Sequence, residues 1–579
     1  MLQSLGPTCA HTLTLTSCRL NYAMTLRRCL MRYLLAAEAD KIQEFIFRSS
    51  RLREVVGASQ LLSRFCEEGA LPLLKKHGGE PNTDILVNDG GSFRIVFRGG
   101  DAESRVQAFG ADLAELYRLS VGGSLSVAEP VRWEGPFQEA NELAGRALRR
   151  AKNHREGSVA EVHMPYMAFC ASCGVGLAET YGRLFKEPTD ARGRYLCATC
   201  QTKAQERWDT RFGFLRSFLV QVIGSEDYLH HFSSPEDADD VAAYDLRKQN
   251  YVAYLVADGN GMGKTFGQCN ELQIKNLSDG LTEAVLSSLA EVTRNLIARV
   301  ELRPNKADTK TVPVLPLILG GDDLFVLIPS AYALDFARRF CLAYEKTVGE
   351  LAKDMGEPKP TVAAAVVICK SKYPYALAHR RAHQLLEEAK RQCKQLAAEK
   401  GVHLSAVNFE VILGNRLAGQ GEEDKEQWGV VRPSLKPYWA TDAPPAEAAE
   451  YGISLSALLQ QRFALKDLPQ KRLAEVRAAF THLPDELKVG NRKKELAQWE
   501  KIYLERPFVR SGFNQELWDA MRDLGQESVE GETKHHWLET RRNGKSPLAH
   551  GLPDLIETWD FAQDLEKSPE DYEAEEREA

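Results

Sequence analysis

The sequence predicts an α+β fold in which two βαββαβ units flank a four-cysteine insert and are followed by a helical domain. Three observations support this prediction. An apolar strand ending in Ala-Asp occurs at 33–40 and again at 251–258, and each is followed later by two β-rich runs that a Gly-Gly pair separates. Two Cys-x-x-Cys pairs lie between these repeats. After about residue 450, apolar residues recur at the spacing of amphipathic helices.

The composition is that of a globular protein with several domains. The chain has 579 residues, of which 44% are hydrophobic and 27% charged, and these fractions exclude a disordered or collagen-like chain. The net charge of −7 excludes a chain that is basic overall and binds nucleic acid through that charge. No apolar run approaches the ~20 residues that cross a bilayer, so we expect no membrane partner.

Residues 1–32 are expected to form an N-terminal extension outside the fold. The segment is poor in acids and contains several arginines, as transit peptides do, but it lacks the basic start and long apolar stretch of a secretory signal. We favour a mis-assigned start, with translation beginning at Met24 or Met31.

The first unit is expected to span 33–160. A basic helical stretch at 43–68 follows its first strand, and residues 85–97 form two β-rich runs joined at Asp89-Gly90-Gly91. An amphipathic helix fits 102–119.

The insert is expected to hold a structural zinc ion. Its two pairs, Cys170-Ala-Ser-Cys173 and Cys197-Ala-Thr-Cys200, are separated by 23 residues, which is typical of paired zinc knuckles. Four thiolates close such a site and leave no open position for catalysis. Reduced cysteines also favour a cytoplasmic location. We assign 161–250 to the knuckles and a helical connection.

The second unit is expected to span 251–415 and to have the ferredoxin-like (βαββαβ) order. Strands are predicted at 251–257, within 312–329 on both sides of Gly320-Gly321, at 361–369 and at 406–412, and helices at 270–300, 332–352 and 376–399.

Three acids of this unit form the candidate catalytic site. In a βαββαβ sheet the first strand lies beside the central hairpin, so Asp258 is expected near Asp322 and Asp323. Close carboxylates repel one another unless a cation lies between them. The set is therefore predicted to bind Mg²⁺ or Mn²⁺ as a two-metal site. The alternative is an ordinary turn with solvated acids.

Residues around these acids are candidates for nucleotide binding. The segment after Asp258 is not a P-loop, because Gly would be needed at position 258. We interpret it as a loop whose amides hold phosphates, in which Lys264 either contacts a phosphate or lies in solvent. Lys390, on the predicted helix, is expected to bind the β- and γ-phosphates. The candidates are Gly259, Asn260, Gly261, Lys264, Gly320, Gly321 and Lys390.

The first unit lacks the full acid set. Asp40 is expected to match Asp258, but Ser92 and Phe93 follow Gly90-Gly91 where the second unit has two acids. One carboxylate cannot hold two metal ions, so this copy is expected to be structural or to close over the substrate of the other.

The rest of the chain is divided by composition. Residues 416–450 are rich in Gly, Pro, Ala and Glu and are predicted to be a linker. A helical C-terminal domain is expected at 451–569, and residues 570–579 form an acidic tail.

Taken together, these motifs resemble the large palm-domain subunit of type III CRISPR effector complexes. The resemblance covers about 33–412 and rests on EADKIQEFIFRSSRLREVVGAS, the paired CxxC motifs, YLVADGNGMGK, LILGGDDLFVLIP and EEAKRQCK. It implies two palm domains and synthesis of cyclic oligoadenylate from ATP when guide RNA pairs with target RNA. The implied partners are ATP, other subunits of the complex, and guide and target RNA. The second palm is also similar to diguanylate cyclases.

Two departures from the family pattern change what is expected. Many members carry an N-terminal nuclease domain with a His-Asp pair, and this sequence has no His-Asp dipeptide, so DNA cleavage is expected to be absent. Asn260 stands where the family often has Asp, so we expect it to contact either the nucleotide or the residues that bind the metal, rather than the metal itself. Two alternatives stay open: a catalytically silent scaffold of the RNA-guided complex, and a stand-alone nucleotide cyclase.

Overall fold

The structure is a computed structural model, and it divides into two compact units that are described separately. Unit 1 comprises 1–48, 57–208 and 263–280, and unit 2 comprises 49–56, 209–262 and 281–579. The predicted extension up to residue 30, residues 416–430 of the predicted linker and the predicted acidic tail lie outside the described residues. The structure describes residues 31–49, 51–153, 166–182, 193–206, 213–304, 309–353, 359–413, 431–465, 470–480, 483, 492–504, 515–525, 528–530, 533–541 and 546–565.

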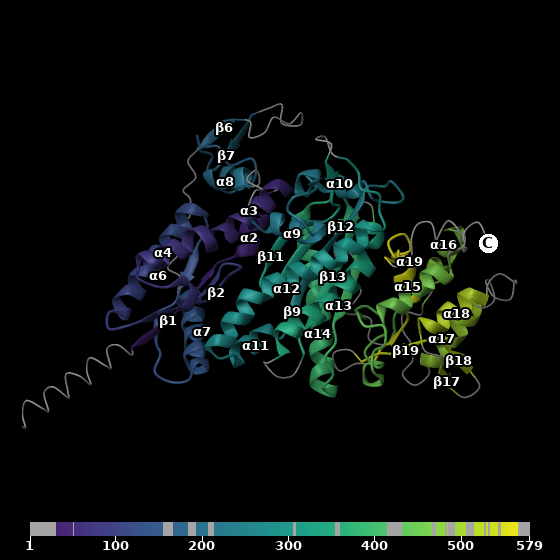
Figure 1. The fold of residues 1–579 in the computed structure, drawn as a ribbon. Coiled ribbons are helices and arrows are strands. Elements are labelled where there is room, and N and C mark those ends of the chain that lie inside the picture. The colour runs from purple at the N-terminus through teal and green to yellow at the C-terminus, as the bar shows by residue number, and fades with distance from the viewer. Residues whose placement is uncertain are drawn as a thin grey trace, which may run out of the picture. The chain divides into compact units, whose positions relative to one another are not determined.

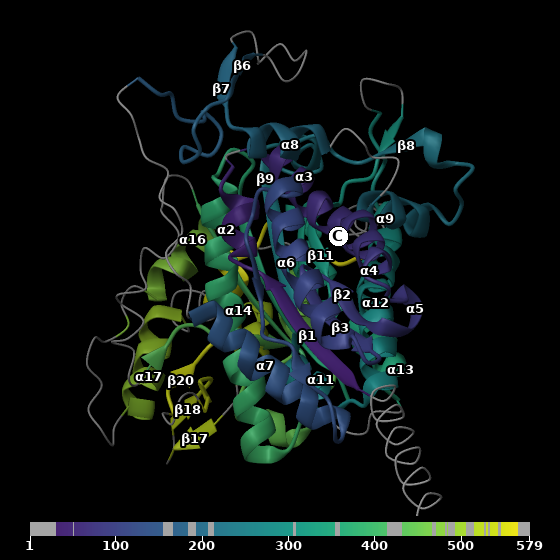
Figure 2. The same cartoon turned by 90° about the vertical axis from the view of Figure 1, so that its left-hand side faces the viewer.

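Unit 1 is built on an antiparallel sheet with the strand order β2-β3-β1-β4, of which Figure 2 labels β1, β2 and β3. Its strands are β1 (Arg32–Ala39), β2 (Ile85–Asp89), β3 (Ser92–Arg98) and β4 (Leu125–Val127), with β5 (Val131–Arg132) also paired to β1. This is the order of a βαββαβ unit. Helices α6 (Ala102–Ser120) and α7 (Phe137–Asn153) pack against the sheet. Their buried residues recur every three or four positions, as an amphipathic helix requires.

Unit 1 also contains the four-cysteine insert and several short helices. The insert has a hairpin of β6 (Thr180–Gly182) and β7 (Arg194–Leu196), followed by α8 (Ala198–Glu206). Helices α3 and α12 are each divided between the two units. The remaining helices are α2 (Ile42–Phe47), α3 (Leu52–Arg64), α4 (Leu71–Lys76), α5 (Pro81–Asp84) and α11 (Met262–Gln268), with a π-helical turn at Phe65–Ala70.

Unit 2 is built on a six-stranded sheet with the order β11-β12-β9-β13-β14-β16, of which Figure 1 labels β9, β11, β12 and β13. Its first four strands again have the βαββαβ order, and β14 is added parallel to β13 after helix α14. The central strands are buried almost throughout, which requires helices on both faces. The strands are β9 (Tyr251–Asn260), β11 (Leu315–Gly320), β12 (Asp323–Pro329), β13 (Thr361–Lys370), β14 (Ala406–Val411) and β16 (Tyr438–Trp439), and the main helices are α12 (Glu271–Ile297), α13 (Ala333–Leu351) and α14 (Tyr375–Lys400).

The central hairpin of unit 2 turns one residue later than the sequence suggested. Gly320 ends β11 and pairs with Asp323, so the two turn residues are Gly321 and Asp322 rather than Gly320 and Gly321. Only Gly321 has a positive φ, +60°, as in turns that need glycine at their first position. The outer strand β11 contains Pro316 and a register shift between Pro316 and Ile318.

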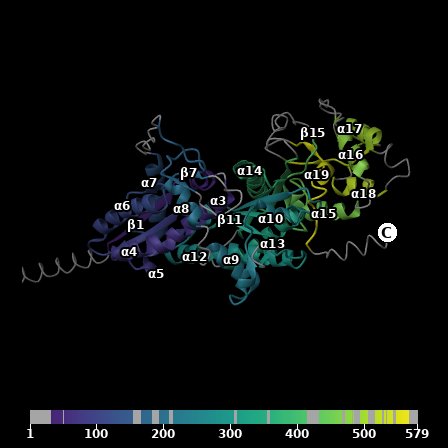
Figure 3. The same cartoon turned by 90° about the horizontal axis from the view of Figure 1, so that it is seen from above.

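The C-terminal part of unit 2 is largely helical, and Figure 3 shows α15, α16, α18 and α19 grouped together. It also contains strands of two or three residues that the sequence analysis did not predict. Such short strands do not show a detectable alternation of apolar and polar residues. The helices of this part are α15 (Leu455–Ala464), α16 (Gln470–Ala479), α17 (Arg492–Glu500), α18 (Gln515–Asp523) and α19 (Leu552–Glu557), and its strands are β15 (Val431–Arg432), β17 (Ser528–Glu530), β18 (Thr533–His535), β19 (Leu538–Glu539) and β20 (Leu548–Ala549). Earlier in the chain, unit 2 also contains α9 (Phe214–Ile223), α10 (Ala238–Ala242), β8 (Phe232–Ser233) and β10 (Lys310–Thr311).

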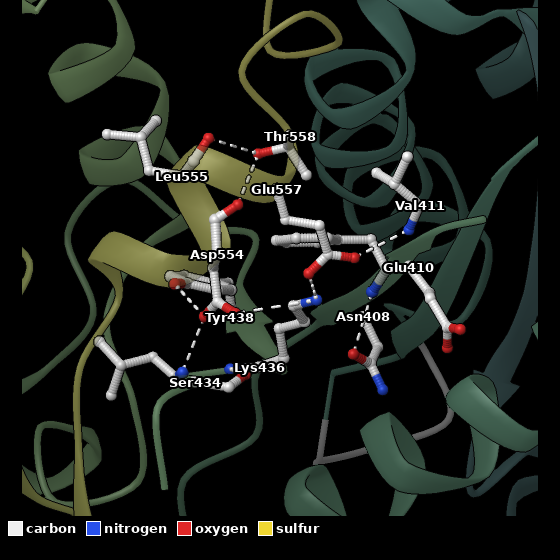
Figure 4. Close-up of polar contacts among 12 residues, drawn as sticks. Asn408, Glu410, Val411, Ser434, Lys436, Tyr438, Asp554, Leu555, Glu557 and Thr558 are labelled. Carbon is white, nitrogen blue, oxygen red and sulfur yellow. Dashed lines mark hydrogen bonds and ion pairs between the residues drawn. The ribbon is translucent and has the colours of Figure 1, made fainter. Parts of the chain in front are cut away.

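A buried polar network joins α19 to the edge of the unit 2 sheet (Figure 4). Lys436 forms an ion pair with Glu557 and lies 3.7 Å from Asp554. One oxygen of Asp554 accepts hydrogen bonds from the Leu435 amide (2.8 Å) and the Tyr438 hydroxyl (2.7 Å). Glu557 accepts a hydrogen bond from the amide of Val411 on β14 at 2.8 Å. The network fixes α19 against strands β14 and β16.

The predicted α+β class is confirmed, with a βαββαβ sheet around the acid motif and a cluster of four cysteines. Among the described residues, no helix combines the length and the apolar character that a membrane span needs.

Candidate functional site

The three predicted acids lie together at the end of β9 and the tip of the β11–β12 hairpin. Leu324 pairs with Ala257, so Asp323 and Asp258 occupy the next positions outward on the two adjacent strands. Asp322 is in the turn. The charge of the Asp258 carboxylate acts on the carboxyls of both Asp322 and Asp323. The three acids therefore form a close group.

The acids perturb one another electrostatically. Burial and the charge of Asp258 raise the pKa of the Asp322 carboxyl to about 6. Desolvation by the surrounding protein atoms, together with the charges of Asp258 and Asp322, raises the pKa of the Asp323 carboxyl to about 7. The residue as a whole is still exposed to solvent at the hairpin. Both shifts mean that the group resists carrying three negative charges without a cation.

Lys390 supplies one positive charge to this group. It extends from α14 and forms an ion pair with the carboxylate of Asp258, and each side chain is about one quarter exposed. The lysine thus offsets one of the three carboxylates and leaves an excess of negative charge. A divalent cation with a preference for oxygen ligands fits this donor set.

The segment after Asp258 is not the loop that the sequence suggested. Strand β9 continues through Asn260, whose side chain donates to the Thr361 hydroxyl on β13 at 3.1 Å. Gly261 alone, with φ of +75°, connects the strand to α11. Strand pairing with β13 overrides the turn-forming tendency of the glycines. Lys264, which belongs to unit 1, is exposed on α11.

The glycines near the acids have particular packing roles. A Cβ atom at Gly259 would lie 2.6 Å from the Tyr344 hydroxyl oxygen and 2.9 Å from an oxygen of Asp322. Gly259 is therefore buried against these groups. The Gly321 amide donates to the Thr282 hydroxyl at 2.9 Å, which leaves it less free to hold a phosphate than we expected.

Sequence reasoning missed Thr282 and Tyr344. Thr282 holds the turn through that amide contact, and Tyr344 on α13 is fully buried beside the acids. Burial and the charges of the three acids raise the pKa of the Tyr344 hydroxyl. Neither residue lies in a motif, since each looks in the sequence like one more position of an amphipathic helix.

Unit 1 contains a counterpart of the acid–lysine pair, but at a residue other than the expected one. Ser92, the first residue after its hairpin turn, pairs with Glu38. Glu38, rather than Asp40, therefore corresponds to Asp258, and it forms a 2.6 Å ion pair with Lys152 on α7. Asp40 instead accepts a hydrogen bond from the Ser126 hydroxyl at 2.8 Å. The matching hairpin positions are Gly91 and Ser92, so unit 1 has no pair of hairpin acids.

The four cysteines of the insert converge as predicted. Their Sγ atoms all lie within 4.8 Å of one another, and Cys173 and Cys197 are 3.9 Å apart. Backbone amides of Ser172 and Gly176 each approach a sulfur at 3.4 Å. The neighbouring thiols raise the pKa of Cys200. A cation that binds soft sulfur ligands fits this cluster.

Comparison with known proteins identifies the segment that carries the acids. Residues 251–397 match the family model of the Cas10/Cmr2 second palm domain. The expected resemblance to the palm subunit of type III CRISPR complexes is therefore confirmed for this segment. No curated protein matches the chain.

Several solved structures are also similar to the chain at low identity. A Csm1–Csm4 cassette in complex with cA4 is 14% identical, with a TM-score of 0.40 and coverage of 81% of this chain and 68% of the other. The Csm1–Csm4 subcomplex of the type III-A CRISPR-Csm interference complex is 15% identical, with a TM-score of 0.43 and coverage of 85% and 68%. Csm1 in T. onnurineus is 15% identical, with a TM-score of 0.41 and coverage of 86% and 70%.

Proposed function

We propose that this chain is a metal-dependent nucleotidyltransferase of type III CRISPR antiviral defence, which makes cyclic oligoadenylate from ATP. One observation carries the proposal: Asp258, Asp322 and Asp323 converge at a strand end and a hairpin within the segment that matches a Cas10/Cmr2 second palm domain. A catalytically silent scaffold would be free to lose these acids.

In the proposed reaction, the 3′-hydroxyl of one ATP attacks the α-phosphorus of another. A 3′–5′ phosphodiester bond forms, the bond to pyrophosphate breaks, and the hydroxyl proton passes to solvent. Mg²⁺ or Mn²⁺ bound by the three acids would stabilise the attacking and leaving oxygens. Lys390, which pairs with Asp258, would stabilise negative charge on the leaving pyrophosphate. Gly320 and the β9 residues Gly259 and Asn260 would border the nucleotide.

The four-cysteine cluster supports a structural zinc site. Cys170, Cys173, Cys197 and Cys200 provide four sulfur ligands, and three of them are buried. This donor set is typical of closed zinc sites that stabilise a fold and leave no position for substrate. The zinc is proposed to hold the β6–β7 hairpin and α8 together.

The remaining roles follow from the family resemblance. We propose that the unit 1 sheet is a degenerate palm, since its hairpin has Gly91 and Ser92 where unit 2 has two acids. Other subunits of the complex, guide RNA and target RNA would be its partners. We also propose that the chain does not cleave DNA. A stand-alone nucleotide cyclase is the alternative, and RNA-independent synthesis by the isolated chain would favour it.

The proposal is tested by incubating the purified complex, with and without target RNA, with each NTP and Mg²⁺ or Mn²⁺. Product masses identify the base and the ring. The Asp322→Asn/Asp323→Asn variant is expected to lose at least about 10²–10³-fold in rate. Asp89→Asn, in the corresponding hairpin of unit 1, is the matched control and should stay active. Synthesis by the double variant at the wild-type rate would refute the assignment.

A further inference from the structure

Tyr344 has a buried hydroxyl beside the acids. Its side chain is fully buried on α13. Within the described part of the chain, this hydroxyl has no hydrogen-bond partner. A buried hydroxyl without a partner lowers stability, so its position calls for an explanation.

The hydroxyl and the Asp322 carboxylate share the space left by a missing side chain. Both oxygens lie within 3 Å of the point where a Cβ of Gly259 would be. Successive residues of a strand point to opposite faces. Lys390 reaches Asp258 from α14, whereas Tyr344 reaches the face of Gly259 from α13. The acid group is thus approached by a cation from one face of β9 and by a hydroxyl from the other.

We propose that Tyr344 is a positioning residue of the acid site, whose hydroxyl donates a hydrogen bond to Asp322 and fixes its carboxylate for cation binding. This inference rests on the proposed function. An ionised carboxylate only accepts hydrogen bonds, and a protonated phenol can donate one. Without a cation the carboxylates repel one another, and the hydroxyl remains unpaired. When a cation holds the Asp322 carboxylate in place, an oxygen of that carboxylate becomes the acceptor that the hydroxyl lacks.

The chain offers a matched control in Tyr254. This tyrosine lies on β9 of the same sheet, is fully buried, and its hydroxyl also has no partner among the described residues. It stacks on Phe325 at 5.7 Å between ring centroids and is away from the acids. Tyr344→Phe and Tyr254→Phe therefore remove the same buried atom from two different surroundings.

The experiment measures Mn²⁺ binding by electron paramagnetic resonance of free Mn²⁺, together with thermal unfolding without added divalent ions. Groups that orient metal ligands typically contribute 10–100-fold to metal affinity. Tyr344→Phe is expected to raise the Mn²⁺ dissociation constant by about that factor, while its metal-free Tm stays at or above the wild-type value. Tyr254→Phe should leave the dissociation constant unchanged.

Each other outcome has a defined meaning. Wild-type Mn²⁺ affinity in Tyr344→Phe would overturn the inference and leave the proposed function intact. A loss of affinity together with a lower metal-free Tm, or an equal loss in Tyr254→Phe, would assign Tyr344 to packing and also overturn it. If Asp322→Asn/Asp323→Asn binds Mn²⁺ like the wild type, the acids are not the metal site, and both the inference and the proposed function fail.

Discussion

Replacing Lys436 with methionine tests whether the buried polar network holds the C-terminal part of unit 2 to its sheet. The Lys436 side chain is 12% exposed, and that of Asp554 is only 2% exposed. Among the described residues, Lys436 is the only cation paired with Asp554. Methionine keeps the length of the side chain but leaves the Asp554 carboxylate buried without a counter-charge.

The expected loss is about 3–5 kcal/mol in the free energy of opening around α19, which is typical when one partner of a buried ion pair is removed. Asp554→Asn should cost less, because one oxygen can still accept from Leu435 and Tyr438 and because Lys436 keeps Glu557. The double variant Lys436→Met/Asp554→Asn should recover most of the loss, since residue 554 no longer carries a charge and Glu557, which also loses Lys436, is 23% exposed and can be solvated by water.

Hydrogen exchange of the α19 amides measures this opening directly. Burial already raises the pKa of the Asp554 carboxyl, and removing Lys436 raises it further. Protonation would then relieve the unpaired charge, so the deficit of Lys436→Met should be smaller at pH 5 than at pH 8. A loss below about 1 kcal/mol, or a double variant no more stable than Lys436→Met, would refute the argument from buried charge.

Two further predictions concern the acid and cysteine groups. The carboxyl pKa values of Asp322 and Asp323 are raised to about 6 and about 7, so the native state binds protons more tightly than the unfolded state. The metal-free protein should therefore lose stability as pH rises from about 4 to about 7. In measurements of Tm against pH, Asp322→Asn/Asp323→Asn should reduce this dependence. An unchanged pH dependence of Tm would contradict the electrostatic argument. Metal analysis should find one zinc per chain, and Cys200→Ser should abolish both the bound zinc and the protection of the α8 amides from hydrogen exchange. Cys269→Ser, at a cysteine outside the cluster, should change neither. Protein that lacks zinc but retains protected α8 amides would refute the site.

The sequence was most informative where a motif has a fixed spacing. Two Cys-x-x-Cys pairs and the Gly-Gly-Asp-Asp turn each restrict several residues at once, and their grouping could be anticipated. The exact hairpin register could not, because Gly320-Gly321 and Gly321-Asp322 both suit a tight turn and pairing with β9 decides between them. In unit 1, the pairing of β1 with β3 likewise makes Glu38, rather than Asp40, the counterpart of Asp258.

Tyr344 could not be identified from the sequence for a different reason. Its importance depends on Gly259, whose lack of a side chain leaves space for the Tyr344 hydroxyl. Gly259 lies 85 positions earlier in the chain, and the two residues come together only after the sheet and α13 have packed. A helix period predicts that such a residue is buried, but it does not predict which polar groups surround it.

The outer strand β11 also bears on the solubility of the protein. An edge strand with free amides can recruit a strand from another molecule and start aggregation. Pro316 has no amide hydrogen to offer, and the register shift beside it interrupts the regular spacing of the neighbouring groups. The strand that carries the acid hairpin is therefore poorly suited to extend the sheet into a second molecule. The register shift and the missing amide hydrogen should help to keep copies of the protein apart at high concentration.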